Sequence, residues 1–385
     1  MKYLSFNFIL FLVIVLIFTV AALFRIYFNY YYSFELDDIN IDDWDRYFRN
    51  AIDIKNNGLL IQNIEENYLL PSGFLYNYFL AFCFLLFGVN ITVVYFIQSA
   101  ILGFSIAITF IVFKDFMSKN ISWIFLFSMI VFAFVDIFKH YTFRLLSENL
   151  VLLTIPLFLL FLKKALLLNN NKKTLYFITG LFLGISVLIR PNIFPFSLVF
   201  LSLVLMFIIL NKTQLLSYFY LTASYLIIMS LLPLRNYFVT GELAFLPVDG
   251  NFLDYIKREN PISFTENFLN FLQFYYNKII YIFGFLPNLE PKFNYRPHWM
   301  IMWLGYFIYI YSAIKRIVKE RSFEIFIHVF IFMFYFIILL IAPITDYGFR
   351  IIIPSLFLVL GFSIIGYKKL YYFFKPIIFK NIFRK

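Results

Sequence analysis

Long apolar runs separated by short polar segments make up most of this sequence. A transmembrane helix needs about 20 mostly apolar residues, and tilting or a thin membrane changes that length only slightly. The run at 6–28 is longer than the core of a cleaved signal peptide and no small-residue cleavage site follows it, so we interpret it as a retained first helix. The pattern predicts ten spans, near residues 6–28, 91–113, 121–138, 147–168, 174–189, 192–210, 214–233, 300–316, 324–342 and 350–366.

Two further apolar stretches, 72–88 and 269–287, are ambiguous, and the distribution of charge decides how they are interpreted. If both lie on the membrane surface and the N-terminus is cytoplasmic, the inside segments hold 18 basic and 3 acidic residues, and the remainder holds 14 basic and 18 acidic residues. Cytoplasmic loops carry an excess of Lys and Arg. The sequence therefore predicts an all-α polytopic protein of the inner (plasma) membrane, with one domain over 1–385 and both termini cytoplasmic.

Composition agrees with a membrane protein, because 63% of the residues are hydrophobic and only 14% are charged, against about a quarter in soluble domains. The net charge of +11 lies mainly on the inside segments, so it indicates orientation in a bilayer and not nucleic-acid binding. Cys83 is the single cysteine, which excludes an intramolecular disulfide. The predicted outer side carries two long loops, 29–90 and 234–299, and loops of that length usually carry function.

The first outer loop contains an acidic cluster, with seven acidic residues in the twenty from Phe34 to Asp53. The stretch "DDWDRYFRNAIDI" predicts a short amphipathic helix in which Asp43, Tyr47 and Ala51 share one face. Acidic residues at such a helix start also complement the helix dipole, without any catalytic role. A Pro-Ser-Gly turn and an aromatic helix follow in "LLPSGFLYNYFLAFCFLLFG", residues 69–88.

These two elements resemble the GT-C glycosyltransferases, and among them the bacterial dolichyl-phosphate-mannose–protein mannosyltransferase-like family, in which both are juxtamembrane helices of the first external loop. Further stretches match in order along nearly the whole chain. They are "FRLLSENLVLL" (143–153), "GLFLGISVLIRPNIFPF" (180–196), "LLPLRNYFVTGELAFLPVDGNFLDY" (231–255) and "DYGFRIIIPSLFLVLG" (346–361).

The resemblance implies an inverting transfer of a sugar from a polyprenyl-phosphate donor to an acceptor at the external face. Such a reaction needs a carboxylate base for the acceptor hydroxyl and cations for the departing phosphate. By its spacing to Tyr47 and Ala51, the family's base position falls on Asp43, with Asp42 and Asp45 as alternatives. Glu148 is the second acid or the first-turn carboxylate of a helix. The candidate phosphate-binding residues, for which snorkelling at span ends is the alternative role, are Arg350, Arg235, Arg190, Arg144, Lys257 and Arg258.

Two other functions fit parts of the pattern. A polymerase or ligase of surface polysaccharides also has about ten spans and a large external loop, and a secondary transporter is a further, less favoured alternative. The resembling branch is not generally metal-dependent, so we expect no metal and no cofactor. The expected partners are the lipid-linked donor, the bilayer and an acceptor that is a protein, a lipid or a glycan, with no nucleic acid.

Overall fold

The structure is a computed structural model of the whole chain, and it describes most of the helical part of the sequence. The described residues are 2–31, 43–58, 73–167, 172–210, 215–241, 243, 283, 297–320, 323–341 and 348–382. Within helices, the side chains at several positions, including Asp43 and Arg350, are not described.

Every regular element in these residues is a helix, which confirms the predicted all-α class. The α-helices are α1 (Lys2–Tyr31), α2 (Asp43–Asn57), α3 (Phe74–Phe87), α4 (Ile91–Phe113), α5 (Lys119–Phe132), α6 (Glu148–Leu167), α7 (Lys172–Ile189), α8 (Phe194–Leu210), α9 (Leu215–Met229), α10 (Leu231–Thr240), α13 (Pro297–Glu320), α14 (Glu324–Ile341) and α15 (Gly348–Ile382). Short 3₁₀ segments, η2 (Lys114–Phe116) and η4 (Pro191–Ile193), and a π-helical segment, η3 (Ala133–Thr142), join some of them.

Four stretches of the described chain are long and apolar enough to cross a membrane, which indicates a membrane protein. They are Ile91–Phe116, Glu148–Leu166, Leu215–Phe238 and Ile353–Phe373. Other apolar helices, such as α8, are shorter where they are described.

The chain divides into two compact units, each described here by itself. Unit 1 holds residues 1–112 and 130–249, and unit 2 holds 113–129 and 250–385. The prediction of a single domain stays a prediction.

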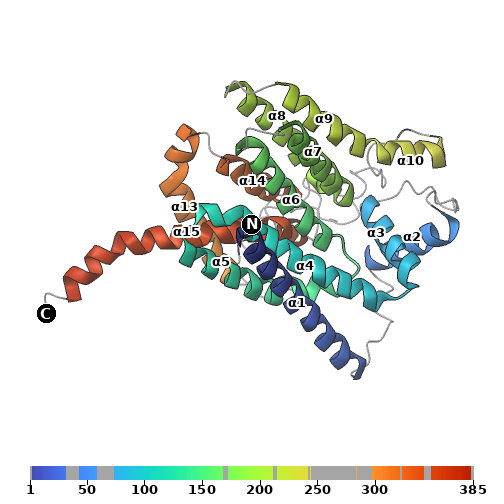
Figure 1. Cartoon of the computed structure of the whole chain (residues 1–385), viewed down its shortest axis with the longest axis horizontal. Helices are drawn as coiled ribbons and strands as arrows, with labels where there is room; N and C mark the ends of the chain where they lie inside the picture. Colours follow the sequence, from blue (N-terminus) through green and yellow to red (C-terminus); the bar gives the residue numbers. More distant parts are fainter. Residues whose placement is uncertain are drawn as a thin grey trace, which may run out of the picture. The chain divides into compact units, whose positions relative to one another are not determined.

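In unit 1, helix α7 packs against α6 and α9 (Figure 1). The contact with α9 depends on two glycines four residues apart. A Cβ at Gly180 would collide with Leu221 and Ser224, and one at Gly184 would lie 2.8 Å from Cβ of Ile228. Small residues at this spacing let two helices approach closely in a membrane.

Helices α2 and α3 form a pair in unit 1 and lie side by side (Figure 1). Helix α2 begins at Asp43 and buries Tyr47, Ala51 and Ile54, so the predicted amphipathic helix is confirmed. The buried positions follow the spacing of one helix face.

In unit 2, helix α15 packs against α13 and α14. Its contact with α13 is again a close approach, because a Cβ at Gly305 would lie 2.5 Å from the Tyr367 ring and 2.8 Å from the backbone oxygen of Ser363. Helix α15 runs to Ile382, well beyond the predicted span end at 366.

Candidate functional site

A buried ion pair joins the start of α6 to the end of α7. Nη1 of Arg190 lies 2.6 Å from Oε1 of Glu148, whose side chain is 0% exposed, and the Arg190 side chain is 12% exposed. Glu148 is in the first turn of α6, where the helix dipole favours a carboxylate. A buried charge is tolerated only when it is paired, so each residue needs the other in this position.

The local sequence explains why Arg190 is available for this pair. Pro191 follows it, and a residue before proline is driven out of the helical region. Arg190 accordingly adopts an extended backbone (φ −144°, ψ 101°) between α7 and η4. Its amide still donates to the Ser186 carbonyl at 3.0 Å, so the side chain leaves the helix at its last turn.

Tyr76 of α3 is part of a buried hydrogen-bond chain next to this pair. Its hydroxyl donates to Oε1 of Gln98 on α4 at 2.7 Å. Nε2 of Gln98 donates in turn to the backbone carbonyls of Thr142 (2.8 Å) and Arg144 (2.9 Å). These bonds tie α3 and α4 to the segment that leads into Glu148.

The Tyr76 hydroxyl is close enough to Glu148 to sense its charge. Burial first, and then Tyr47 and the Glu148 carboxylate, hold the pKa of Tyr76 well above that of an exposed tyrosine. The hydroxyl therefore stays protonated and remains a hydrogen-bond donor. Helix α3 thus lies beside the Glu148–Arg190 pair.

Aromatic contacts bring α2 to the same place. The rings of Tyr47 and Tyr76 meet edge to face with centroids 5.0 Å apart, and those of Phe48 and Phe84 meet at 5.7 Å. Such arrangements suit the ring quadrupoles and add about 0.5–1.5 kcal/mol per pair beyond burial.

Gly73 makes room for Tyr47 at the turn before α3. Its φ of +93° is unfavourable for other residues, and a Cβ there would lie 2.5 Å from Cε1 of Tyr47. The glycine of the Pro-Ser-Gly turn thereby allows α2 and α3 to meet.

The structure places the predicted site residues in different surroundings. Asp45 forms an ion pair of 2.5 Å with Arg49, one turn further along α2, on the exposed side. The Arg144 side chain is exposed. Arg235 is 6% exposed, and its guanidinium bonds Oδ1 of Asn236 (3.0 Å) and the Tyr78 hydroxyl.

Other predicted residues fall outside what the structure describes. Asp42, Lys257 and Arg258 are outside the described residues, and so are the side chains of Asp43 and Arg350. Asp43 is placed by its backbone alone, as the first residue of α2, one turn before Tyr47. Among the predicted charged residues that the structure describes, Glu148 and Arg190 form an ion pair with each other.

Sequence reasoning missed two buried polar residues, Gln98 on α4 and Asn77 on α3. Gln98 lies inside an apolar run, and an uncharged polar residue in such a place usually has a partner, so this signal was present. The sequence around Asn77 on α3 carries a weaker signal that this residue is buried. Asn77 is 0% exposed, and neither atom of its side-chain amide makes a hydrogen bond within the described structure.

Comparisons with protein-family models, with curated proteins and with solved structures gave no match. Within the described residues, no three His, Cys, Asp or Glu side chains are grouped as metal ligands would be. The chemistry of the site therefore has to be argued from its own residues: a buried, arginine-bound carboxylate beside a helix pair that begins with an acidic cluster.

Proposed function

We propose that the protein is a GT-C-like membrane glycosyltransferase that moves a sugar from a polyprenyl-phosphate donor to an acceptor at the external face. The observation that carries this proposal is the convergence of separate sequence stretches. Tyr47, Tyr76, Glu148 and Arg190 come from four different parts of the chain and are linked in unit 1 by the Tyr47–Tyr76 ring contact, the electrostatic influence of Glu148 on Tyr76 and the Glu148–Arg190 ion pair. All four stretches involved also carry the resemblance to this family.

The proposed architecture has ten spans, with α2 and α3 lying along the membrane surface. Helix α3 has 14 residues and is about 21 Å long at 1.5 Å per residue, whereas the hydrocarbon core is about 30 Å thick. Helix α2 is polar on one face and carries Asp45, Arg46, Arg49 and Asp53. Both properties favour an interfacial position over a crossing.

In this proposal the base is an acidic residue at the start of α2. The attack of an acceptor hydroxyl on the anomeric carbon needs a carboxylate that takes the proton. Glu148 is engaged by Arg190, and Asp45 is engaged by Arg49. Asp43 therefore remains our preferred base, and Glu148 with Arg190 positions the helix pair that carries it.

The donor phosphate needs cations at the same face. Since Arg190 is bound to Glu148 and Arg235 is buried against α3, we assign donor binding first to Arg144 and Arg350, with Lys257 and Arg258 as further candidates. A bidentate Arg–phosphate contact, with two parallel hydrogen bonds, is well suited to hold the leaving group.

The test uses membranes that contain the full chain, supplied with polyprenyl-phosphate sugars and scored for sugar transfer. We expect Asp43→Asn to lower turnover by about 10²–10⁴ while donor binding stays unchanged, because only the proton acceptor is lost. Asp45→Asn is the matched control on the same helix and should transfer nearly normally.

Three results would count against the proposal. Normal transfer by Asp43→Asn with loss of transfer in Asp45→Asn or Asp42→Asn would assign the role of base to a different residue, but the protein would still be a glycosyltransferase. Normal transfer by all three variants would remove the catalytic role of this helix. Absence of transfer by the wild-type chain with every donor, together with polymerisation of lipid-linked glycans or with solute transport, would favour one of the two alternative functions.

A further inference from the structure

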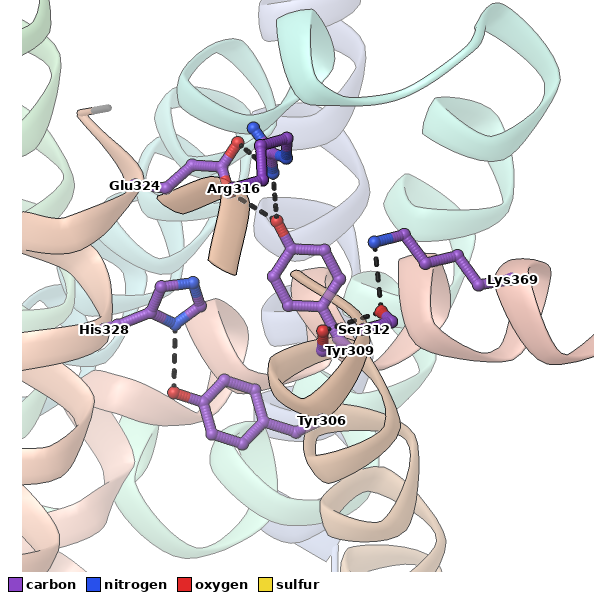
Figure 2. Close-up of polar contacts among 7 residues, drawn as sticks. All are labelled: Tyr306, Tyr309, Ser312, Arg316, Glu324, His328 and Lys369. Carbon is purple, nitrogen blue, oxygen red and sulfur yellow. Dashed lines mark hydrogen bonds and ion pairs between the residues drawn. The ribbon is translucent and has the colours of Figure 1, made fainter. Parts of the chain in front are cut away.

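The helix ends of unit 2 contain a polar network that the proposed function does not use (Figure 2). Glu324, at the start of α14 and 5% exposed, accepts hydrogen bonds from the Tyr309 hydroxyl and from Nη2 of Arg316 (2.7 and 3.0 Å to its two oxygens). Nη2 of Arg316 also donates to the Tyr309 hydroxyl at 3.1 Å. The buried carboxylate thus fixes the guanidinium at the end of α13.

A second cation, Lys369 of α15, joins the same cluster from the other side. Its Nζ donates to Oγ of Ser312 at 3.0 Å and lies 4.7 Å from the centroid of the Tyr309 ring. Figure 2 shows Arg316 at the hydroxyl of Tyr309 and Lys369 beside its ring. An ammonium has three N–H donors, so the bond to Ser312 accounts for one of them.

The cluster has more positive than negative charge, and part of it is open. Residues 315–324 and 368–373 together hold six basic and two acidic residues. The Arg316 side chain is 40% exposed even though it is bound to Glu324. Two cations near one buried carboxylate attract a further anion, because that anion would relieve their mutual repulsion.

The position of the cluster along the helices points to a lipid as the source of the anion. Lys369 lies near the end of the apolar stretch of α15, Ile353–Phe373, and the exposed rings of Tyr371 and Tyr372 follow it within that stretch. Aromatic and basic residues gather at the depth of the lipid headgroups. The distribution of basic residues along the chain predicts that this cluster faces the cytoplasm, where the membrane surface is anionic.

We propose that the end of α13, the start of α14 and the part of α15 around Lys369 bind the phosphate of an anionic phospholipid, with Lys369 and Arg316 as the phosphate ligands and Glu324 as the residue that orients Arg316. Basic pockets between transmembrane helices bind lipid headgroups in this way. The site does not depend on the proposed sugar transfer, and it would hold for any activity of this chain.

The experiment titrates the purified full chain in neutral detergent with phosphatidylglycerol or phosphatidylcholine, and counts bound lipid by native mass spectrometry. We expect phosphatidylglycerol to bind about fivefold more tightly than phosphatidylcholine, and Lys369→Gln to weaken phosphatidylglycerol binding about fivefold. Lys369→Arg should bind like the wild type. Lys319→Gln, an exposed lysine on α13, is the matched control and should bind within about twofold of the wild type.

Folding is checked by the thermal midpoint of each variant without added lipid. Lys369→Met, which keeps the aliphatic contact with Tyr309, is the second neutral variant if Lys369→Gln unfolds. Equal binding of both lipids, unchanged binding by the neutral Lys369 variants, or equal losses in Lys369→Gln and Lys319→Gln would overturn the proposal. Inorganic phosphate that binds as tightly as phosphatidylglycerol would assign the site to free phosphate and overturn the lipid assignment.

Discussion

Removing either charge of the Glu148–Arg190 pair should loosen unit 1, and the size of the effect follows from burial. At 2.6 Å and an effective dielectric constant of about 20, the two charges attract by about 6 kcal/mol before desolvation is subtracted. Breaking a buried pair by removing one partner costs about 3–5 kcal/mol, because the other charge stays buried without compensation. We expect Glu148→Gln and Arg190→Gln each to destabilise unit 1 by that amount.

The double variant, Glu148→Gln with Arg190→Gln, should be much less destabilised than the sum of the two single variants. Neither charge is left behind in it, and replacing a whole buried pair often has little cost. We expect the coupling between the two positions to be about 3 kcal/mol, at the upper end for residues in contact.

Cys83 provides a native reporter for this measurement. It lies on α3, 3% exposed, and burial raises the pKa of its thiol to about 11, so at pH 8 it reacts slowly in the folded protein. Its labelling rate by a thiol reagent then reports how often this part of unit 1 opens. A loss of 3 kcal/mol or more should raise that rate at least about 10²-fold in each single variant.

The double-mutant cycle can also refute the coupling between Glu148 and Arg190. If the double variant is labelled faster than the wild type by the product of the two single effects, the residues act independently and the pair has no coupling. Asp53→Asn, a partly exposed acid on α2, controls for loss of any negative charge and should change the rate little.

Three further predictions concern other parts of the chain. Gly73→Ala should destabilise the α2–α3 pair by about 2–4 kcal/mol, since it combines a positive φ with a collision against Tyr47; unchanged Cys83 labelling would contradict this. Asn77→Leu should raise the thermal midpoint, because it removes a buried amide that has no hydrogen-bond partner among the described residues, at a cost of about 1–3 kcal/mol; a lower midpoint would show that the amide is satisfied by another part of the chain. In a cysteine-free background, a cysteine at Lys319 should be labelled only after permeabilisation and one at Asn251 in intact cells, and the reverse would break the ten-span topology.

The elements of this fold were easier to predict than their contacts. Helix α2 could be predicted because the spacing of Tyr47 and Ala51 marks one buried face, and the end of α7 could be predicted because Pro191 stops the helix at Arg190. The end of α15 could not, since the apolar run shows where a helix leaves the membrane and contains no signal for where the helix itself stops.

The pairing of Glu148 with Arg190 could not be predicted for a different reason. Both residues were recognised as important, but an apolar period does not say which helices meet, and the two lie 42 positions apart in sequence. The sequence made Arg190 one of six candidates for binding a substrate phosphate, with snorkelling as the alternative, and within the described residues it is paired with the chain's own Glu148 carboxylate. Gly73 is a similar case, because the space that a Cβ would need there is occupied by the Tyr47 ring of another helix.

This pairing changes what each carboxylate of the proposed site can do. The Glu148 carboxylate is held at 2.6 Å by the Arg190 guanidinium, so in our proposal it positions the helix pair and does not take the proton of the acceptor. An acid at the start of α2 interacts with the helix dipole, which is worth about 0.3–1 kcal/mol. In our proposal this acid takes the proton of the acceptor hydroxyl. Two carboxylates in different environments can have different roles in this way, one in positioning and one in proton transfer.

These different roles predict that Glu148→Asp, which shortens the side chain but keeps its charge, should lower both stability and transfer, whereas Asp43→Asn should lower transfer alone. Equal losses of stability in the two variants would show that both acids are structural.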